Sequence, residues 1–277
     1  MYNVSFFSVF FWSFPIGIFV LISRKLEFNA LHLVLLINHR SLTTEHPSSI
    51  LINTMSTDKQ YISYNHVHLL CLEASKKVKE FNPDYIICIG GGGFIPARMM
   101  RSCIKETGKQ TTRIFAIILS LYEDINNGDG TSVEDIGTKV NRIQWIDYEQ
   151  CNLELLGKKV LIIDEVDDSR TTLHYALEEL KKDCQEEANK KNINLEEHPE
   201  LKTDFGIFVL HNKIKEKKAD LPAEMLNNPI KYIAARTIPD AWIVYPWENN
   251  DVHFHQEQAE LQGNDLYDQS KENSTTF

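Results

Sequence analysis

The sequence has few basic residues for its length: 29 Lys and Arg stand against 39 Asp and Glu in 277 residues, and the net charge is −10. This balance excludes a nucleic-acid partner, because phosphate contacts need basic residues clustered over a broad face. The five cysteines form no CxxC pair, and the histidines show no metal-ligand spacing such as HExxH. We therefore expect a cytoplasmic protein with reduced thiols and no zinc site.

One long apolar run stands apart from the rest of the chain. Val4 to Ile22 is almost entirely apolar and is followed by Arg24 and Lys25, so a membrane would be a partner if this segment were kept as a signal anchor. Met55-Ser-Thr-Asp-Lys looks like a natural start, which favours upstream sequence for the residues before it. We expect an N-terminal extension at 1–54, an enzyme domain at 55–255 and a polar, frayed tail at 256–277.

The most informative stretch runs from Val160 to Leu173, VLIIDEVDDSRTTL. Its four apolar residues predict a buried strand of a parallel sheet, and the segment that opens at Ser169 carries apolar residues at helical spacing. Four acids separate the two, namely Asp164, Glu165, Asp167 and Asp168. We expect a strand, an acidic turn and a helix start, which is the order that a nucleotide-type site requires.

The residues that open this helix favour a bound phosphate. Hydroxyl groups stand where the first helical N–H groups lack partners, and Arg170 adds a positive charge, so a phosphate would meet hydrogen bonds and the helix dipole. The carboxylates upstream would repel that phosphate, and we expect them to accept hydrogen bonds from the hydroxyls of an attached sugar. The alternative is an ordinary helix that is capped by Asp168 or Ser169.

This stretch resembles the phosphoribosyl-diphosphate signature of type I phosphoribosyltransferases, in which an apolar strand precedes an acidic pair and a D-[ST]-G-x-T-like loop. The resemblance implies that Asp164 and Glu165 hold the ribose hydroxyls and that Asp168 is the catalytic proton acceptor near N7 of a purine. It also places four residues around the 5′-phosphate: Ser169, Arg170, Thr171 and Thr172. Many members carry Gly where Arg170 stands, which puts the loop backbone there in doubt.

A glycine run lies one strand–helix unit upstream, in DYIICIGGGGFIPARMM. Consecutive glycines permit positive φ and close approach of the backbone to a diphosphate, although such a run is as often a flexible turn. The family's diphosphate loop occupies this place and often includes a cis peptide, which Gly91 and Gly92 would flank. Many relatives have Arg or Lys where Gly91 stands, so that cationic contact is missing here or is supplied from elsewhere.

Downstream, YIAARTIPDAWIVYPWE resembles the purine-binding end of bacterial xanthine-guanine phosphoribosyltransferases. That match implies that Trp242 stacks on the purine, that Ile243 offers backbone groups to its edge, and that Glu248 helps to hold Mg²⁺ on the diphosphate. An alignment to the human-type hypoxanthine-guanine enzymes makes Asp240 the metal ligand instead, but the longer match favours Glu248. Trp242 could also be a half-buried core residue, and we expect Trp247 to belong to the core.

Two further parts of the site are left with alternatives. The purine's 6-oxo group should meet a cation at the end of a strand, where Lys213 is the candidate by charge and His211 by register, unless Lys213 only begins a solvated basic run. After the strand predicted at Arg113 to Ser120, family members carry a catalytic hood with a Ser-Tyr pair, which Ser120 and Tyr122 approximate. The polar, glycine-rich segment at 126–131 would then be a mobile loop rather than an idle surface excursion.

Together these features predict an α/β fold, a doubly wound and mostly parallel sheet of the type I phosphoribosyltransferase kind with a small hood region. The five predicted strands are Tyr85–Ile89, Arg113–Leu119, Val160–Ile163, Phe205–Leu210 and Tyr232–Ala235. From about Lys59 to Gln262 the chain resembles fungal hypoxanthine-guanine phosphoribosyltransferases. The resemblance implies transfer of the phosphoribosyl group from phosphoribosyl diphosphate to hypoxanthine or guanine, giving IMP or GMP, with Mg²⁺ as cofactor and a homodimer as assembly. A xanthine preference, or a non-catalytic regulator that binds a nucleotide or sugar diphosphate, is the alternative.

Overall fold

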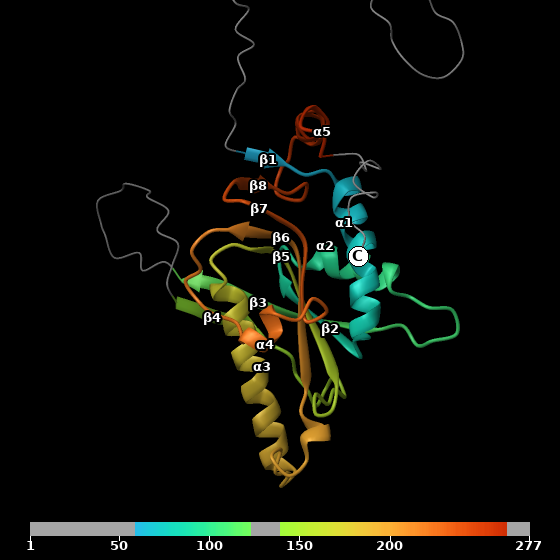
Figure 1. Ribbon diagram of the computed structural model, residues 1–277, viewed down its shortest axis with the longest axis vertical. Coiled ribbons are helices and arrows are strands. Elements are labelled where there is room, and N and C mark those ends of the chain that lie inside the picture. The colour runs from blue at the N-terminus through green and yellow to red at the C-terminus, as the bar shows by residue number, and fades with distance from the viewer. Residues whose placement is uncertain (1–58, 123–138, 265–277) are drawn as a thin grey trace, which may run out of the picture. The chain divides into compact units, whose positions relative to one another are not determined.

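A six-stranded sheet organises the computed structural model, which describes residues 59–122 and 139–264 (Figure 1). The strand order is β4-β3-β2-β5-β6-β7, and all neighbouring strands are parallel except the β3–β4 pair at one edge. The strands are β2 (Tyr85–Gly90), β3 (Arg113–Tyr122), β4 (Lys139–Gln144), β5 (Lys159–Asp167), β6 (Asp204–Ile214) and β7 (Tyr232–Pro239). The predicted doubly wound, mostly parallel sheet is confirmed.

The order of the strands sets the position of a binding crevice. The chain lays β3 on one side of β2 and then crosses to β5 on the other side. The loops that follow β2 and β5 therefore leave the sheet in opposite directions, and open α/β sheets bind ligands at such a switch point, outside the carboxyl ends of the strands. The glycine run follows β2 and the acidic stretch ends β5, so both segments lie at this point.

Helices cover both faces of the sheet, which explains why its central strands are continuous apolar runs. α1 (Tyr64–Phe81) and α2 (Phe94–Cys103) pack over a core that includes Ile86 and Leu161. α3 (Thr171–Lys190) packs on the opposite face, over a core that includes Ile87 and Ile162. Two short helices complete the described connections, η1 (Pro199–Leu201) and α4 (Ala223–Leu226).

A small hood is built from both ends of the described chain. β1 (Lys59–Tyr61) and β8 (Trp242–Val244) form a two-stranded parallel sheet, with Lys59 opposite Trp242, and α5 (Val252–Leu261) packs against it. Figure 1 shows these three elements together, beyond the end of β7. This hood is a different part of the chain from the catalytic hood predicted after Ser120, which stays a prediction. The glycine-rich loop expected there, at 126–131, lies outside the described residues, as does the extension at 1–54.

The sequence boundary predicted at residue 255 falls inside α5. Asp251 caps this helix by accepting a hydrogen bond from Phe254 N at 3.0 Å, and Ala259 is fully buried. Beyond the helix, the Gln262 side chain accepts a hydrogen bond from Tyr61 N at 2.8 Å. The segment from Gln256 to Asn264 is therefore not a frayed end, although its composition is polar, because a few buried groups anchor it.

No helix of the described residues is long and apolar enough to cross a membrane.

Candidate active site at the switch point

The glycine loop approaches the end of β5 closely. A Cβ atom on Gly92 would lie 1.7 Å from Glu165 Oε2, and one on Gly93 would lie 2.5 Å from the carbonyl oxygen of Ile163. Position 93 therefore requires glycine because the obstacle is backbone, a Cβ at position 92 would displace the Glu165 side chain, and Gly91 has open space around it. The cis peptide joins Gly90 to Gly91, one residue earlier than the expected place between Gly91 and Gly92.

The acidic pair lies on the strand and not in a turn, contrary to the predicted order. β5 continues through Asp167 because its ladder with β6 persists, with Asp164 opposite Val209 and Asp167 opposite Asn212. The Asp164 carboxylate is buried and accepts a hydrogen bond from Glu165 N at 2.9 Å. Burial, and then the charge of Glu165, raise the pKa of Asp164 well above its usual value. The pair is thus a concentration of negative charge beside the glycine loop.

Asp168 lies between two lysines at the carboxyl end of β6. Lys215 Nζ is 2.8 Å from Asp168 Oδ1, and Lys213 Nζ is 3.4 Å from Asp168 Oδ2. Burial acts to raise the pKa of Asp168, but the hydrogen bond from Lys215 and the charges of both lysines outweigh it, so the pKa lies below its usual value. Asp168 is therefore a carboxylate that stays ionised and can accept a proton or a hydrogen bond.

The hydroxyl-rich loop (residues 168–172) leads into α3 at the switch point. Ser169 Oγ and Thr171 Oγ1 share a hydrogen bond of 3.0 Å. The N-cap of α3 is Arg170, which makes no capping hydrogen bond with its side chain, so neither Asp168 nor Ser169 is the cap of an ordinary helix. Thr172 lies in the first turn of the helix. The described hydroxyls and the helix start thus lie together, as a phosphate site requires.

Arg170 does not point its charge toward this loop as expected. Its guanidinium donates from Nε and Nη2 to Asp167 Oδ2, at 3.0 and 2.8 Å. The backbone of Arg170 has a φ of 70°, in the left-handed region that favours glycine. The backbone at position 170 thus keeps a conformation that glycine favours, although the residue is arginine, and in this structure the Arg170 guanidinium contacts a buried carboxylate.

The end of β6 settles which side chain is the cation near Asp168. Lys213 is mostly buried, and its Nζ also lies 3.8 Å from Asp240 Oδ1. His211 is 3% exposed, and its Nδ1 shares a 2.9 Å hydrogen bond with Tyr245 Oη. Burial, with the charges of His66 and Arg236, lowers the pKa of His211 to about 3, so this side chain is neutral. His211 is therefore a poorer candidate for the cation than Lys213, whose contact with the purine stays a prediction.

His211 leads to a prediction about stability. Unfolded His211 gains a proton as the pH falls below about 6.5, whereas the folded form stays neutral down to about 3. Folding therefore loses up to about 1.4 kcal/mol per pH unit across this window, and the contribution is complete only above it. We expect the free energy of unfolding of H211Q, measured by urea titration, to fall less steeply from pH 6.5 to pH 4 than that of the unmodified protein. Equal slopes would contradict a neutral buried His211.

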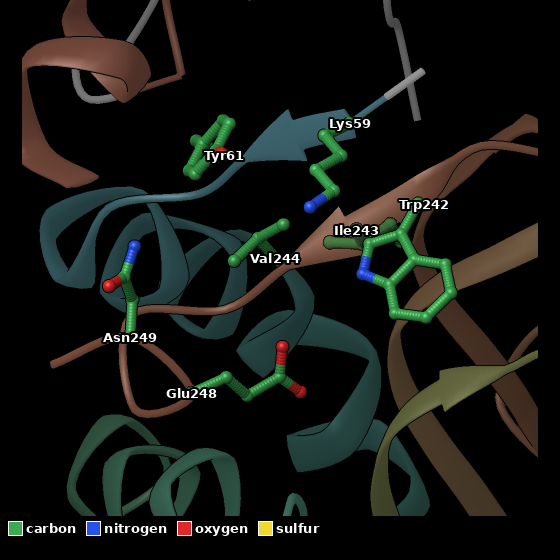
Figure 2. Close-up of a pocket in the computed structure, with 7 residues that line it drawn as sticks. All are labelled: Lys59, Tyr61, Trp242, Ile243, Val244, Glu248 and Asn249. Carbon is green, nitrogen blue, oxygen red and sulfur yellow. The ribbon is translucent and has the colours of Figure 1, made fainter. Parts of the chain in front are cut away.

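Trp242 and Glu248 lie on either side of a pocket that is lined by β1, β8 and the segment after β8. Figure 2 shows the Trp242 indole and the Glu248 carboxylate turned toward one another, with Lys59 above them. Trp242 is 57% exposed, which excludes a core role and suits a stacking surface. Ile243, beside it on β8, is buried. Trp247 packs on the core and stacks on Tyr245, with ring centroids 4.9 Å apart, as expected for a core residue.

The two candidate metal ligands differ in their surroundings. Glu248 Oε2 accepts a hydrogen bond from Tyr245 N at 3.1 Å, and burial together with the charge of Glu165 raises the pKa of Glu248. Asp240 instead pairs with Lys215 at 3.1 Å and with Lys213. Among residues 59–122 and 139–264, no three His, Cys, Asp or Glu side chains form a preformed metal cage. Glu248 is the candidate that adds to a negative cluster, while the Asp240 charge is already balanced by lysines.

Two lysines in the site were not recognised from the sequence. Lys215 bridges Asp168 and Asp240, and Lys217 lies 3.3 Å from Asp167. Lys213, Lys215 and Lys217 alternate with other residues, and this spacing of two is the signal that could have found them. The alternative of a solvated basic run is wrong for these three. Of the predicted Ser-Tyr pair, Ser120 lies on β3 opposite Asn141 of β4, and the side chain of Tyr122 lies outside what the structure describes.

The chain is similar in sequence to known purine phosphoribosyltransferases. The chain is 63% identical over 212 residues to the hypoxanthine-guanine phosphoribosyltransferase of Saccharomyces cerevisiae, covering 76% of this chain and 96% of that one. It is 49% identical to xanthine phosphoribosyltransferase 1 of the same yeast, over 75% and 98% of the two chains. A hypothetical protein from Neisseria gonorrhoeae, crystallised with bound ppGpp, superposes with a TM-score of 0.53 at 32% identity, over 74% and 97%. No family model matches the chain.

The strand order, the glycine loop after β2 and the acidic end of β5 define a type I phosphoribosyltransferase fold, with the glycine loop and the acidic stretch at its switch point. The identity to the yeast enzyme, over nearly all of that enzyme's length, narrows the class further. The chain belongs to the hypoxanthine-guanine phosphoribosyltransferase family.

Proposed function

We propose that this protein is a purine-salvage enzyme that transfers the 5-phosphoribosyl group of phosphoribosyl diphosphate to N9 of hypoxanthine or guanine, giving IMP or GMP and diphosphate. One observation carries the proposal. Asp168 pairs with Lys213 directly after the acidic end of β5, and the exposed Trp242 shares a pocket with Glu248, whose pKa is raised in part by the charge of Glu165, so a sugar phosphate and a planar base can be held next to each other. The identity to the yeast enzyme of that name supports the same substrates.

The sugar phosphate fits the half of the site that β2 and β5 provide. Its 5′-phosphate would receive hydrogen bonds from Ser169, Thr171, Thr172 and the first N–H groups of α3. Asp164 and Glu165 would accept hydrogen bonds from the ribose hydroxyls. The backbone at Gly91 and Gly92 would lie against the diphosphate, where side chains would prevent a close approach.

The purine fits the half that β6 and the hood provide. Its ring would stack on Trp242, an interaction worth about 1 to 3 kcal/mol per base and tolerant of the base identity. Backbone groups of Ile243 would meet its edge, and Lys213 would donate to the 6-oxo group. Asp168 would accept the proton at N7 while N9 forms its bond to C1′ and the bond from C1′ to the diphosphate oxygen breaks. Positioning of the two reactants would contribute most of the rate.

The residues at the acidic end of β5 fit a magnesium ion that arrives with the diphosphate. Mg²⁺ is usually held by one or two carboxylates together with substrate phosphates, so a preformed cage is not needed. Burial and the charge of Glu165 raise the pKa of Glu248, and burial and the same charge raise that of Asp164, so a cation would relieve repulsion here. Bound Mg²⁺ would offset the charge of the leaving diphosphate, and we propose Glu248 rather than Asp240 as its protein ligand.

A pair of variants tests this choice of metal ligand. We expect E248Q to raise the Mg²⁺ concentration for half-maximal activity by about tenfold or more, because a carboxylate is lost from the cluster. D240N removes an equal charge from a residue that is paired with Lys213 and Lys215, and it should leave the magnesium requirement nearly unchanged. A larger shift for D240N than for E248Q would assign the metal to Asp240.

The function itself is tested with purified protein, magnesium and phosphoribosyl diphosphate, given hypoxanthine, guanine or xanthine in turn. Formation of IMP and GMP is the expected result. Faster turnover of xanthine would instead favour a xanthine-preferring phosphoribosyltransferase. The 49% identity to the yeast xanthine enzyme supports this second candidate less than the 63% identity supports a hypoxanthine-guanine enzyme. Tight ligand binding without nucleotide formation would indicate a regulator and contradict the proposal. The homodimer and the cytoplasmic location stay predictions.

A further inference from the structure

A buried ion-pair network lies directly behind the hydroxyl-rich loop. We call it the Asp167 network, and it consists of Asp167, Arg170, Lys217 and Tyr232. The Asp167 side chain is fully buried, and its Oδ2 accepts two hydrogen bonds from the Arg170 guanidinium, at 3.0 and 2.8 Å. The Tyr232 hydroxyl donates to the same oxygen, and Lys217 Nζ lies 3.3 Å from Oδ1. Asp167 Oδ2 thus accepts hydrogen bonds from Arg170 and Tyr232, whereas Oδ1 accepts no hydrogen bond and lies beside the charge of Lys217.

The same network holds the loop backbone. Lys217 Nζ donates to the carbonyl oxygens of Asp167 and Asp168, at 2.7 and 2.9 Å. The backbone N–H of Lys218 donates to the carbonyl of Ser169 at 3.0 Å. Three consecutive carbonyls of the loop are therefore fixed by the segment that follows β6. Because Tyr232 begins β7, the network ties the loop to two neighbouring strands as well as to β5.

The backbone conformation at Arg170 is unfavourable for a residue that carries a side chain. A φ of 70° suits glycine, and a side chain with a Cβ atom opposes it. The Arg170 side chain also lies over the Tyr232 ring, with its guanidinium carbon 5.5 Å from the ring centroid. The ion pair and this ring contact hold the residue in the left-handed conformation. The side chain that disfavours the turn thus also supplies the contacts that keep it.

Resting on the proposed function, we propose that Arg170 is a positioning residue. Its guanidinium acts through Asp167 and holds the hydroxyl-rich loop in the shape that receives the 5′-phosphate. The guanidinium itself makes no contact with that phosphate. Two guanidinium nitrogens of Arg170 donate to one oxygen of Asp167, and this geometry needs the planar fork of arginine, which lysine lacks. A direct contact with phosphate would instead need only a positive charge that reaches the ligand.

Kinetics of R170G, R170K, D167N and R170G/D167N separate these two roles. R170G removes the side chain at a backbone position that glycine tolerates, so the fold should persist. We expect KM for phosphoribosyl diphosphate to rise on the order of tenfold to a hundredfold in R170G, R170K and D167N, with a smaller change in KM for the purine. The double variant should be no worse than the poorer single variant, because both substitutions break the same contact. Multiplying effects, or wild-type KM in R170K, would overturn the inference.

Lys231 provides a matched control, because it pairs with Asp204 at 2.6 Å near the amino end of β6. K231M should leave both KM values unchanged. Amide hydrogen exchange over residues 168–172 needs no substrate, and we expect it to be faster in R170G and D167N but not in K231M. Unchanged protection in D167N would overturn the inference whatever the kinetics. Absence of nucleotide formation by the unmodified protein would contradict the proposed function, whereas normal turnover by R170G would contradict this inference alone.

Discussion

Replacing Asp168 with Asn should lower turnover by about 10²- to 10⁴-fold while nucleotide binding changes little. Asn keeps the size of the side chain and can still accept a hydrogen bond from Lys215 or Lys213, so the local geometry should persist. It cannot take up the proton from N7, and it lacks the negative charge that would stabilise the positive charge developing on the purine as N9 forms its bond to C1′. The loss therefore falls on the transition state rather than on the bound product.

The two effects are separated by steady-state kinetics and by titration of IMP into the purified variant. D204N is the matched control, since Asp204 is also an aspartate paired with a lysine but lies at the opposite end of β6. It should retain wild-type kcat. If D168N lost IMP affinity as strongly as turnover, Asp168 would hold the nucleotide and would not be the base.

Because the pKa of Asp168 lies below its usual value, kcat of the unmodified protein should not depend on Asp168 titration above about pH 4.

The sheet and its switch point are predictable because their signals are local. Buried strands covered on both faces are apolar runs, and loops that approach a ligand closely need glycine or small polar residues. Ile86–Ile89 and Val160–Ile163 are such runs, and the segments after them are the glycine loop and the acidic stretch. Which segments lie at the site thus follows from composition and order, without knowledge of long-range contacts.

What the sequence does not predict depends on partners that are distant in the chain. His211 and Lys213 are two residues apart and both polar, and it is burial in the fold, with the charges of His66 and Arg236, that lowers the pKa of His211. Arg170 follows four acids closely, and its partner Asp167 is also contacted by Tyr232 and Lys217, which are more than 45 residues away from Arg170 in the sequence. The hood joins Lys59 to Trp242, and no local pattern indicates such a pairing.

The glycine loop offers the second large effect, in Gly92→Ala. The added Cβ would lie 1.7 Å from Oε2 and 1.8 Å from Cδ of Glu165, a distance at which one of the two groups must move. The Glu165 carboxylate is the end of a flexible side chain and moves more easily than the backbone, so the fold should be kept. The displaced carboxylate would no longer meet a ribose hydroxyl, and we expect kcat/KM for phosphoribosyl diphosphate to fall on the order of a hundredfold.

Two companion variants show whether displacement of Glu165 is the cause. G91A places a Cβ in open space on the same loop, so its loss should be much smaller than that of G92A. E165D shortens the acid by one methylene and withdraws the carboxylate from position 92. Adding G92A to E165D should therefore lower kcat/KM by a smaller factor than adding G92A to the unmodified protein. Wild-type kinetics for G92A would show that Glu165 does not hold the sugar. A loss in G91A as large as in G92A would point to the loop backbone, because the Cβ at position 91 meets nothing within 4 Å.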